Sequence, residues 1–177
     1  MTGGGAREKT VLSAGGEKVL VALGSNIEPE RYLPTTILRL RQRFPDLAVS
    51  PVYSSQPVGT SGPEFHNAAV CFRTRLSPEK LKFDVLRPLE ADFGRVRCDD
   101  RNAPRTIDLD IAFFGDRVID DRSKRLRIPD PEVLRYAHLA VPLADLEPCL
   151  RHPVDGRALA EIAEPFRRAG GLVLVSG

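Results

Sequence analysis

The segment 106–114 reads Thr-Ile-Asp-Leu-Asp-Ile-Ala-Phe-Phe, and it constrains the fold of this 177-residue chain more than any other stretch. Apolar and acidic residues alternate over its first half, which is the pattern of a half-buried β-strand. Because side chains on a strand point alternately to opposite faces, Asp108 and Asp110 share one face while the apolar residues between them enter the core. Two neighbouring carboxylates repel each other unless a cation lies between them. We therefore predict a strand that either binds Mg²⁺ through Asp108 and Asp110 or exposes two solvated aspartates.

A loop rich in arginine leads into this strand. The arginines within residues 95–105 are Arg95, Arg97, Arg101 and Arg105. Asp99 and Asp100 offset part of their charge. One guanidinium group can bind two phosphate oxygens at once. An arginine loop beside a strand with two carboxylates is typical of a site for a triphosphate with Mg²⁺. The alternative is a solvated loop whose arginines pair with its own aspartates.

The composition excludes several classes of function. The chain has 26 basic and 24 acidic residues and a net charge of +2, a balance that argues against broad binding of nucleic acids or membranes by charge. The apolar runs are far shorter than the ~18–20 residues that span a bilayer, and no secretory signal is visible. The cysteines Cys71, Cys98 and Cys149 match neither a disulfide framework nor a zinc pattern. We expect a reduced, cytoplasmic protein.

The order of the expected elements predicts the fold class. Residues 1–17 lack periodicity and indicate a flexible tail, followed by a single domain at 18–177. Strands are expected at 19–23, 47–54, 65–75, 106–114, 118–120, 126–128 and 172–175, and helices at 29–43, 77–93, 137–146 and 156–166. Pro88 should kink or shorten the second helix. This succession predicts an α+β fold with a ferredoxin-like sheet, mainly antiparallel, and helices packed on its faces.

Several motifs occur together in a specific order. They are the runs Leu-Gly-Ser-Asn at 23–26, Ser-Pro-Val-Tyr-Ser-Ser-Gln-Pro-Val-Gly at 50–59, Phe-His-Asn-Ala-Ala-Val at 65–70, Gly-Arg-Val-Arg at 94–97, Ala-Pro-Arg-Thr-Ile-Asp-Leu-Asp-Ile at 103–111, Ile-Pro-Asp-Pro at 128–131 and Val-Pro-Leu at 141–143. The combination resembles the 2-amino-4-hydroxy-6-hydroxymethyldihydropteridine pyrophosphokinase family. The resemblance implies an enzyme of folate biosynthesis. It would transfer pyrophosphate from ATP, its co-substrate, to the hydroxymethyl group of 6-hydroxymethyl-7,8-dihydropterin and release AMP.

The resemblance also implies roles for individual residues. Asp108 and Asp110 would hold two Mg²⁺ ions that bridge the ATP phosphates, and Arg95 and Arg97 would complete the catalytic set and contact ATP. The other residues implied to contact ATP are Arg87, Glu90, Arg105, Ile111, Arg125 and Asp130. The residues implied to bind the pterin are Ser55, Gln56, Val58, Phe65, Asn67 and His138.

Chemistry supports the implied pterin contacts. Phe65 offers an aromatic face for the flat bicycle, and Asn67 offers donors and an acceptor for its amide-like edge. His138 would cover the other face of the ring. The chain departs from the family pattern at three nearby positions. Asp130 and Tyr136 stand where a histidine and an arginine are usual, and His138 stands where an aromatic residue usually covers the other face of the pterin.

Two other classes remain as alternatives. A Mg²⁺-dependent nucleotidyltransferase or phosphohydrolase would also place Asp-x-Asp on a strand. A ferredoxin-like RNA-binding module would carry stacking aromatics and basic residues on its sheet, whereas aromatic residues make up only 6% of this chain. We expect a monomer whose ligands are ATP and the pterin, without a nucleic-acid or membrane partner.

Overall fold

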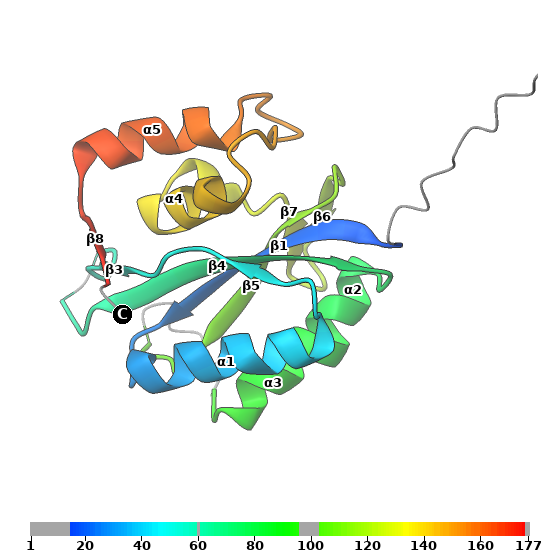
Figure 1. Ribbon diagram of the computed structural model, residues 1–177, viewed down its shortest axis with the longest axis horizontal. Coiled ribbons are helices and arrows are strands. Elements are labelled where there is room, and N and C mark those ends of the chain that lie inside the picture. Colours follow the sequence, from blue (N-terminus) through cyan, green and yellow to red (C-terminus); the bar gives the residue numbers. More distant parts are fainter. Residues whose placement is uncertain (1–14, 60, 96–102, 176–177) are drawn as a thin grey trace, which may run out of the picture.

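The computed structural model of the chain describes residues 15–59, 61–95 and 103–175. A central sheet lies between α1, α2 and α3 on one face and α4 and α5 on the other (Figure 1). The elements in chain order are β1 (Glu17–Ser25), α1 (Pro29–Arg43), β2 (Ala48–Val49), β3 (Tyr53–Ser55), β4 (Phe65–Thr74), α2 (Pro78–Leu81), the π-helical turn η1 (Lys82–Leu86), α3 (Arg87–Asp92), β5 (Asp108–Phe114), β6 (Ile119–Asp121), β7 (Leu126–Ile128), the 3₁₀ helix η2 (Pro131–Leu134), α4 (Ala137–Leu146), α5 (Leu159–Ala169) and β8 (Leu172–Leu174).

The described strands form one main sheet and one small sheet. The main sheet has the order β5-β1-β4-β3-β8, with β2 also paired to β4, and the small sheet pairs β6 with β7. All of these pairings are antiparallel. The predicted α+β fold with a mainly antiparallel sheet is confirmed. The predicted tail at 1–17 falls mostly outside the described residues, and β1 already begins at Glu17.

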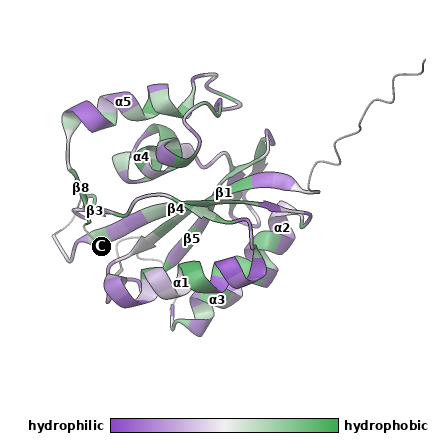
Figure 2. Cartoon of the chain, in the orientation of Figure 1, coloured by the Kyte–Doolittle hydropathy of each residue, from purple (hydrophilic) through white to green (hydrophobic). Residues whose placement is uncertain are grey.

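Two apolar cores hold the layers together. The core between the sheet and α1, α2 and α3 contains Leu109 and Ile111 from β5, as the alternation predicts. The core between the sheet and α4 and α5 contains Leu20, Ala69 and Phe113. Hydrophilic and hydrophobic residues alternate along α1 and α5 (Figure 2), and the buried ones are Leu33, Thr36 and Leu40 in α1 and Leu159, Ile162 and Ala163 in α5. No helix in the described ranges is long and apolar enough to cross a membrane.

A bulge in β5 changes which face its residues occupy. Val21 of β1 pairs with Ile111, whereas Leu20 pairs with Phe113, so Ala112 is an extra residue in β5. Ala112 and Phe113 consequently both enter the second core, although strict alternation would separate them. The carbonyl of Ala112 accepts a hydrogen bond of 3.0 Å from the Asp130 backbone N–H. The bulge therefore fixes the segment that begins at Asp130 beside the aspartates of β5.

Two prolines explain where the predicted elements are interrupted. The expected helix at 77–93 is irregular, as Pro88 predicts, and it contains a π-turn in which the Arg87 N–H donates to the Lys82 carbonyl. This wider turn precedes Pro88, whose ring would clash with the carbonyl four residues earlier in a regular helix. The expected strand at 47–54 is split by Pro51 into β2 and β3. A proline cannot donate a hydrogen bond to the sheet.

Candidate functional site

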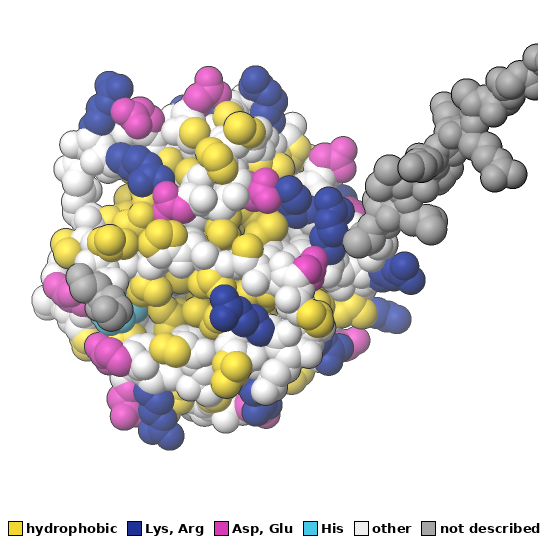
Figure 3. Space-filling model, viewed as in Figure 1, with side chains coloured by type: hydrophobic (Ala, Val, Ile, Leu, Met, Phe, Trp, Pro, Cys, Tyr) yellow, Lys and Arg dark blue, Asp and Glu magenta, His cyan; other side chains and the backbone are white. Residues whose placement is uncertain are grey.

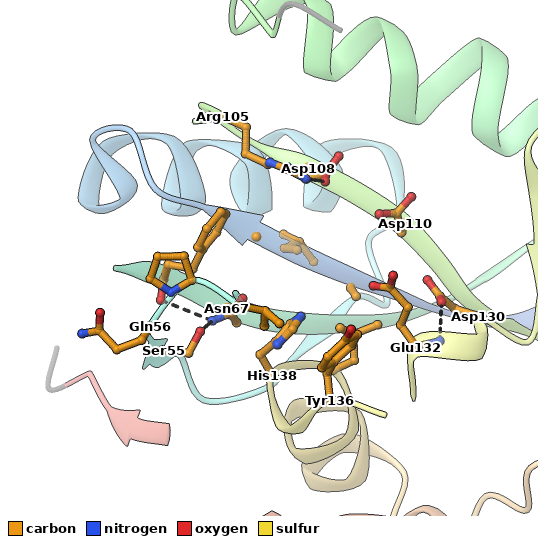
Figure 4. Close-up of a pocket in the computed structure, with 17 residues that line it drawn as sticks. Ser55, Gln56, Asn67, Arg105, Asp108, Asp110, Asp130, Glu132, Tyr136 and His138 are labelled. Carbon is orange, nitrogen blue, oxygen red and sulfur yellow. Dashed lines mark hydrogen bonds and ion pairs between the residues drawn. The ribbon is translucent and has the colours of Figure 1, made fainter. Parts of the chain in front are cut away.

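A pocket of about 310 Å³ opens on the side of the sheet that carries α4. Its walls come from the adjoining ends of β1, β3, β4 and β5 and from the segment between η2 and α4 (Figure 4). The residues that line it are Ala22, Leu23, Gly24, Ser55, Gln56, Pro57, Val58, Phe65, Asn67, Arg105, Asp108, Asp110, Asp130, Glu132, Tyr136, His138 and Leu139.

The strand register builds the floor of this pocket. Gly24 of β1 pairs with Asp108 on one side and with Asn67 on the other. Directly paired residues of antiparallel strands point to the same face, so Asp108 and Asn67 face the pocket across Gly24, with their strands ~10 Å apart. In the next row, Ala22 lies between Asp110 and Ala69. Small residues on β1 therefore leave the space open between the acidic side of the pocket, formed by Asp108 and Asp110, and the amide side, formed around Asn67.

The turn after β1 is hydrogen-bonded to the segment that enters β5, and we call the bonds of Asn26 to Arg105 the clamp. The Asn26 side-chain oxygen accepts a 2.7 Å hydrogen bond from the Arg105 N–H, and the Arg105 carbonyl accepts from the backbone N–H groups of Asn26 and Ile27. The Ser25 hydroxyl donates to the Thr106 carbonyl at 2.6 Å. These bonds explain the Leu-Gly-Ser-Asn motif, because they fix Arg105 and the start of the aspartate strand.

Arg95 is held at the end of α3. Gly94 has a φ of +74°, its N–H donates to the Ala91 carbonyl, and the Arg95 N–H donates to the Glu90 carbonyl. This is a Schellman ending, which explains why Gly94 stops the helix as predicted. The Arg95 guanidinium group then lies 3.0 Å from one Asp108 oxygen, while Arg105 binds the other oxygen. Both oxygens of Asp108 are thus paired with arginine.

Asp110 carries the strongest electrostatic perturbation of the site. Loss of hydration, followed by the charges of Asp108, Asp130 and Glu90, raises the pKa of Asp110 to about 8, and Lys82 opposes this shift. The Asp110 side chain is nevertheless exposed in the pocket, so its carboxylate is accessible to a ligand. Burial also raises the pKa of Asp130, to about 6. The site therefore concentrates negative charge that a cation would stabilise.

The residues of β5 suit Mg²⁺. Asp108 and Asp110 supply hard carboxylate oxygens on one face of the strand, in a pocket wide enough for phosphate groups. Within the described ranges no cluster of three or more histidine, cysteine or acidic side chains forms a protein-only metal cage. Mg²⁺ is usually held by one or two carboxylates together with substrate phosphates, and this donor set fits that arrangement.

The amide side of the pocket is ordered by Asn67. Its side-chain nitrogen donates to the Ser55 hydroxyl at 2.9 Å and to the carbonyls of Tyr53 and Phe65. These bonds orient the amide so that its oxygen faces the floor, where a Cβ on Gly24 would lie 3.7 Å away. Asn67 therefore presents mainly its acceptor oxygen, whereas both kinds of group were expected. Phe65 stands beside it, with the Arg105 guanidinium 5.7 Å from the ring centroid.

His138 forms the α4 side of the pocket together with Tyr136. Their rings are stacked, with centroids 5.4 Å apart and planes at 20°. Burial lowers the pKa of His138 to about 4, so the imidazole is neutral at physiological pH. Figure 4 shows His138 on the α4 side, near Asn67 and Ser55. A neutral flat ring at this position is suited to contact an uncharged heterocycle.

Five of the predicted ATP contacts do not line this pocket. Arg95 reaches the site through Asp108. Glu90 is fully buried and accepts a 2.8 Å hydrogen bond from the Leu109 N–H, so it supports β5 from behind. Ile111 belongs to the core, Arg125 is exposed, and the Arg87 guanidinium lies 4.7 Å from the centroid of the Phe83 ring. Arg97 lies outside the described residues.

The remaining predicted residues meet in the pocket, along with some that the pattern did not single out. Ser55, Gln56, Val58, Phe65, Asn67, Arg105, Asp108, Asp110, Asp130 and His138 all line it. Glu132 and the clamp residue Asn26 were not predicted to serve the site. Asn26 belongs to the Leu-Gly-Ser-Asn motif at 23–26. Nothing in the local pattern indicates that its side chain reaches Arg105.

Comparison with known proteins identifies relatives across most of the chain. Residues 20–148 match the family model of 7,8-dihydro-6-hydroxymethylpterin-pyrophosphokinase (HPPK). The chain is 42% identical over 156 residues to a 2-amino-4-hydroxy-6-hydroxymethyldihydropteridine pyrophosphokinase of Pseudomonas aeruginosa, covering 85% of this chain and 93% of that protein. It is 36% identical over 135 residues to a folate synthesis bifunctional protein of Arabidopsis thaliana, covering 73% of this chain but 27% of that protein.

The fold is shared with solved structures. The wild-type HPPK-DHPS of Plasmodium falciparum superposes with a TM-score of 0.63 at 13% identity, covering 86% of this chain and 45% of that one. At this identity the likeness concerns the fold alone. The chain spans less than half of that structure and about a quarter of the bifunctional plant protein.

The clamp at Asn26 generates a stability prediction. Asn26→Ala removes the acceptor of the Arg105 N–H in a place where Asn26 is only 7% exposed, so the free energy of unfolding should fall by about 1–3 kcal/mol. Urea denaturation followed by circular dichroism measures this. As a control, Gln42→Ala on the exposed side of α1 should change it by no more than about 0.5 kcal/mol. Equal losses in the two variants would contradict the clamp.

The burial of His138 generates a pH prediction. Its pKa in the folded protein lies near 4, below the ordinary value of 6.5, so the unfolded chain binds the proton more readily. This contribution to stability is complete above the ordinary pKa and is lost as the pH falls towards 4. Between pH 7.5 and pH 5 the parent should lose about 1–2 kcal/mol more unfolding free energy than His138→Phe. Parallel denaturant titrations measure it, and identical losses would refute the prediction.

Proposed function

This chain belongs to the 7,8-dihydro-6-hydroxymethylpterin-pyrophosphokinase family, and on that premise we propose that it is an ATP-dependent diphosphotransferase of folate biosynthesis. It transfers the pyrophosphoryl group of ATP to the hydroxymethyl group of 6-hydroxymethyl-7,8-dihydropterin and releases AMP. The family match covers residues 20–148, which contain the strands of the pocket and the segment after η2.

One observation carries this proposal most directly. Asp108, Gly24 and Asn67 form one row across three neighbouring strands and face the same pocket. The row joins a carboxylate suited to a metal–phosphate group with an amide oxygen suited to the N–H edge of a pterin. A flat bicycle that contacts Asn67 would direct its substituent along Gly24 towards the aspartates.

The reaction requires positioning more than protein nucleophiles. The hydroxymethyl oxygen attacks the β-phosphorus of ATP, the bond from that phosphorus to the oxygen bridging to the α-phosphorus breaks, and AMP leaves with that oxygen. The hydroxyl proton passes to solvent or a phosphate oxygen. Two Mg²⁺ ions, which Asp108 and Asp110 would hold, neutralise phosphate charge when bound. The chain's part is to align the two substrates and to surround the phosphates with fixed charge.

Arg95 and Arg105 would supply the positive charge on the protein side. Both are largely buried next to Asp108, with 12% and 16% of their side chains exposed. In this arrangement the arginines compensate the Asp108 charge. Mg²⁺ held by Asp108 would compete with these guanidinium groups for the carboxylate oxygens, and a guanidinium group released from Asp108 would then be placed to bind an ATP phosphate. Arg97 would join them, as the family motif implies.

The alternative of an RNA-binding module is disfavoured by two features. Helices cover both faces of the main sheet in the described part of the chain, so that the faces are not open platforms for stacked bases (Figure 1). On the molecular face shown in Figure 3, basic and acidic side chains are interspersed around apolar patches. Such mixed charge contrasts with the basic surface that a nucleic acid requires. The cytoplasmic location and the monomeric state stay predictions.

The proposed reaction predicts a specific product and a specific defect. Incubation with ATP, Mg²⁺ and hydroxymethyldihydropterin should yield AMP, and AMP formation should depend on the pterin. Asp110→Asn should reduce this rate by at least about 100-fold because a carboxylate that would hold the cation is lost, while circular dichroism stays unchanged. Asp116→Asn, at the exposed turn after β5, serves as the control. Production of ADP, or a folded Asp110→Asn protein with normal turnover, would overturn the proposal.

The ion pair of Arg95 and Asp108 predicts a gain in metal binding. Arg95→Ala frees one Asp108 oxygen, so Mn²⁺, used as a spectroscopic substitute for Mg²⁺, should bind the variant about 3- to 10-fold more tightly in the absence of ATP. The same variant should be slower in pyrophosphoryl transfer. Electron paramagnetic resonance of free Mn²⁺ measures the affinity, and Arg117→Ala, which breaks the distant pair with Glu17, is the control. Unchanged or weaker Mn²⁺ binding in Arg95→Ala would contradict the competition.

A further inference from the structure

Glu64, the residue before β4, does not line the pocket, but its carboxylate contacts the residues on either side of the pocket residue Ser55. Its carboxylate accepts one hydrogen bond from the Ser54 hydroxyl of β3 and another, of 2.6 Å, from the Gln56 side-chain nitrogen. The intervening residue, Ser55, lines the pocket and accepts from Asn67. Glu64 therefore grips the chain on both sides of a pocket residue.

The loop after β3 has few groups of its own that could hold it in place. Residues 56–59 read Gln-Pro-Val-Gly, so that Gln56 is the single polar side chain among them. Pro57 has no N–H to donate, and Gly59, with a φ of +76°, has no Cβ to restrict its backbone. Gln56, Pro57 and Val58 nevertheless line the pocket. The hydrogen bond from Gln56 to Glu64 ties this loop back to the start of β4.

The direction of Gln56 supports the same conclusion. In Figure 4 its side chain extends away from the other labelled pocket residues, while Ser55 points to Asn67. The amide nitrogen of Gln56 is engaged by Glu64. The returning chain also passes close to the loop, since a Cβ added to Gly62 would lie 3.6 Å from the Pro57 Cγ. Gln56 thus lines the pocket while its side-chain nitrogen is held by Glu64, which fastens the loop.

We propose that Glu64 is a positioning residue for the pterin side of the pocket: it holds Ser54 and Gln56 so that Ser55 and the backbone of the 56–58 loop are already placed when the pterin arrives. This inference rests on the proposed function, because it assigns the amide side to the pterin. The loop then loses little conformational freedom on binding, which improves affinity without a direct contact. ATP binds at the aspartate side and is unaffected.

The test is a comparison of pterin and ATP binding in Glu64→Ala. Calorimetric titration with hydroxymethyldihydropterin, in the presence of a non-hydrolysable ATP analogue and Mg²⁺, should show about 3- to 10-fold weaker pterin binding. The affinity for the ATP analogue alone and kcat at saturating pterin should stay within about twofold. Glu164→Ala, which removes an exposed glutamate paired with Arg168 on α5, is the matched control and should bind both ligands like the parent.

A double-mutant cycle shows whether Gln56 acts by holding the loop through Glu64 or by contacting the pterin directly. Gln56→Ala should weaken pterin binding by no more than Glu64→Ala does, because Glu64→Ala also removes the hydrogen bond from Ser54. The double variant should bind the pterin no more weakly than Glu64→Ala alone, because the bond that Gln56→Ala removes is already lost in Glu64→Ala. The conservative Glu64→Gln, which keeps an acceptor for Gln56, should recover part of the affinity. Additive losses would assign Gln56 to the pterin itself and overturn the proposal, as would parent-like pterin binding in Glu64→Ala or an equal loss of ATP affinity. Failure of the parent to bind the pterin would instead refute the proposed function.

Discussion

The site depends on the small size of two residues in the central strand. β1 lies between β4 and β5, and at Ala22 and Gly24 it presents no side chain beyond a Cβ to the pocket. A larger residue at either position would fill the space between Asn67 and the aspartates. The rest of the arrangement follows from the strand register. Asn67 on β4 and Asp108 on β5 both pair with Gly24, so they lie directly across β1 from each other. The pocket is thus a property of strand pairing, and α4 closes one side of it.

The charges of the site are balanced by neighbours from different parts of the chain. Asp108 is paired with Arg95 from the end of α3 and with Arg105 from the entry to β5. Loss of hydration, and then the neighbouring carboxylates, raise the pKa of Asp110. Asp110 is exposed in the pocket, whereas Asp108 is largely covered and paired with two arginines. The same strand face therefore carries one charge-compensated aspartate and one that is accessible to a ligand. This imbalance is what gives a divalent cation a place to bind.

Much of the fold and part of the site could be predicted from the sequence. The alternation around Asp108 and Asp110 correctly indicated their shared face, and the pattern at 65–70 placed Phe65 and Asn67 on a strand. Local pattern could not predict the bulge at Ala112, because a bulge results from pairing with β1. It also could not show that Gln56 turns to Glu64, since that bond closes a loop whose ends meet only in the folded sheet.

The most direct test of this account is a crystal structure with Mg²⁺, a non-hydrolysable ATP analogue and hydroxymethyldihydropterin bound together. The account predicts Mg²⁺ at ~2.0–2.1 Å from oxygens of Asp108 and Asp110, the pterin between Phe65 and His138 with its edge at the Asn67 oxygen, and the Arg95 guanidinium moved from Asp108 to a phosphate. A structure in which Arg95 and Arg105 both remain on Asp108 while the metal and phosphates lie elsewhere would contradict it.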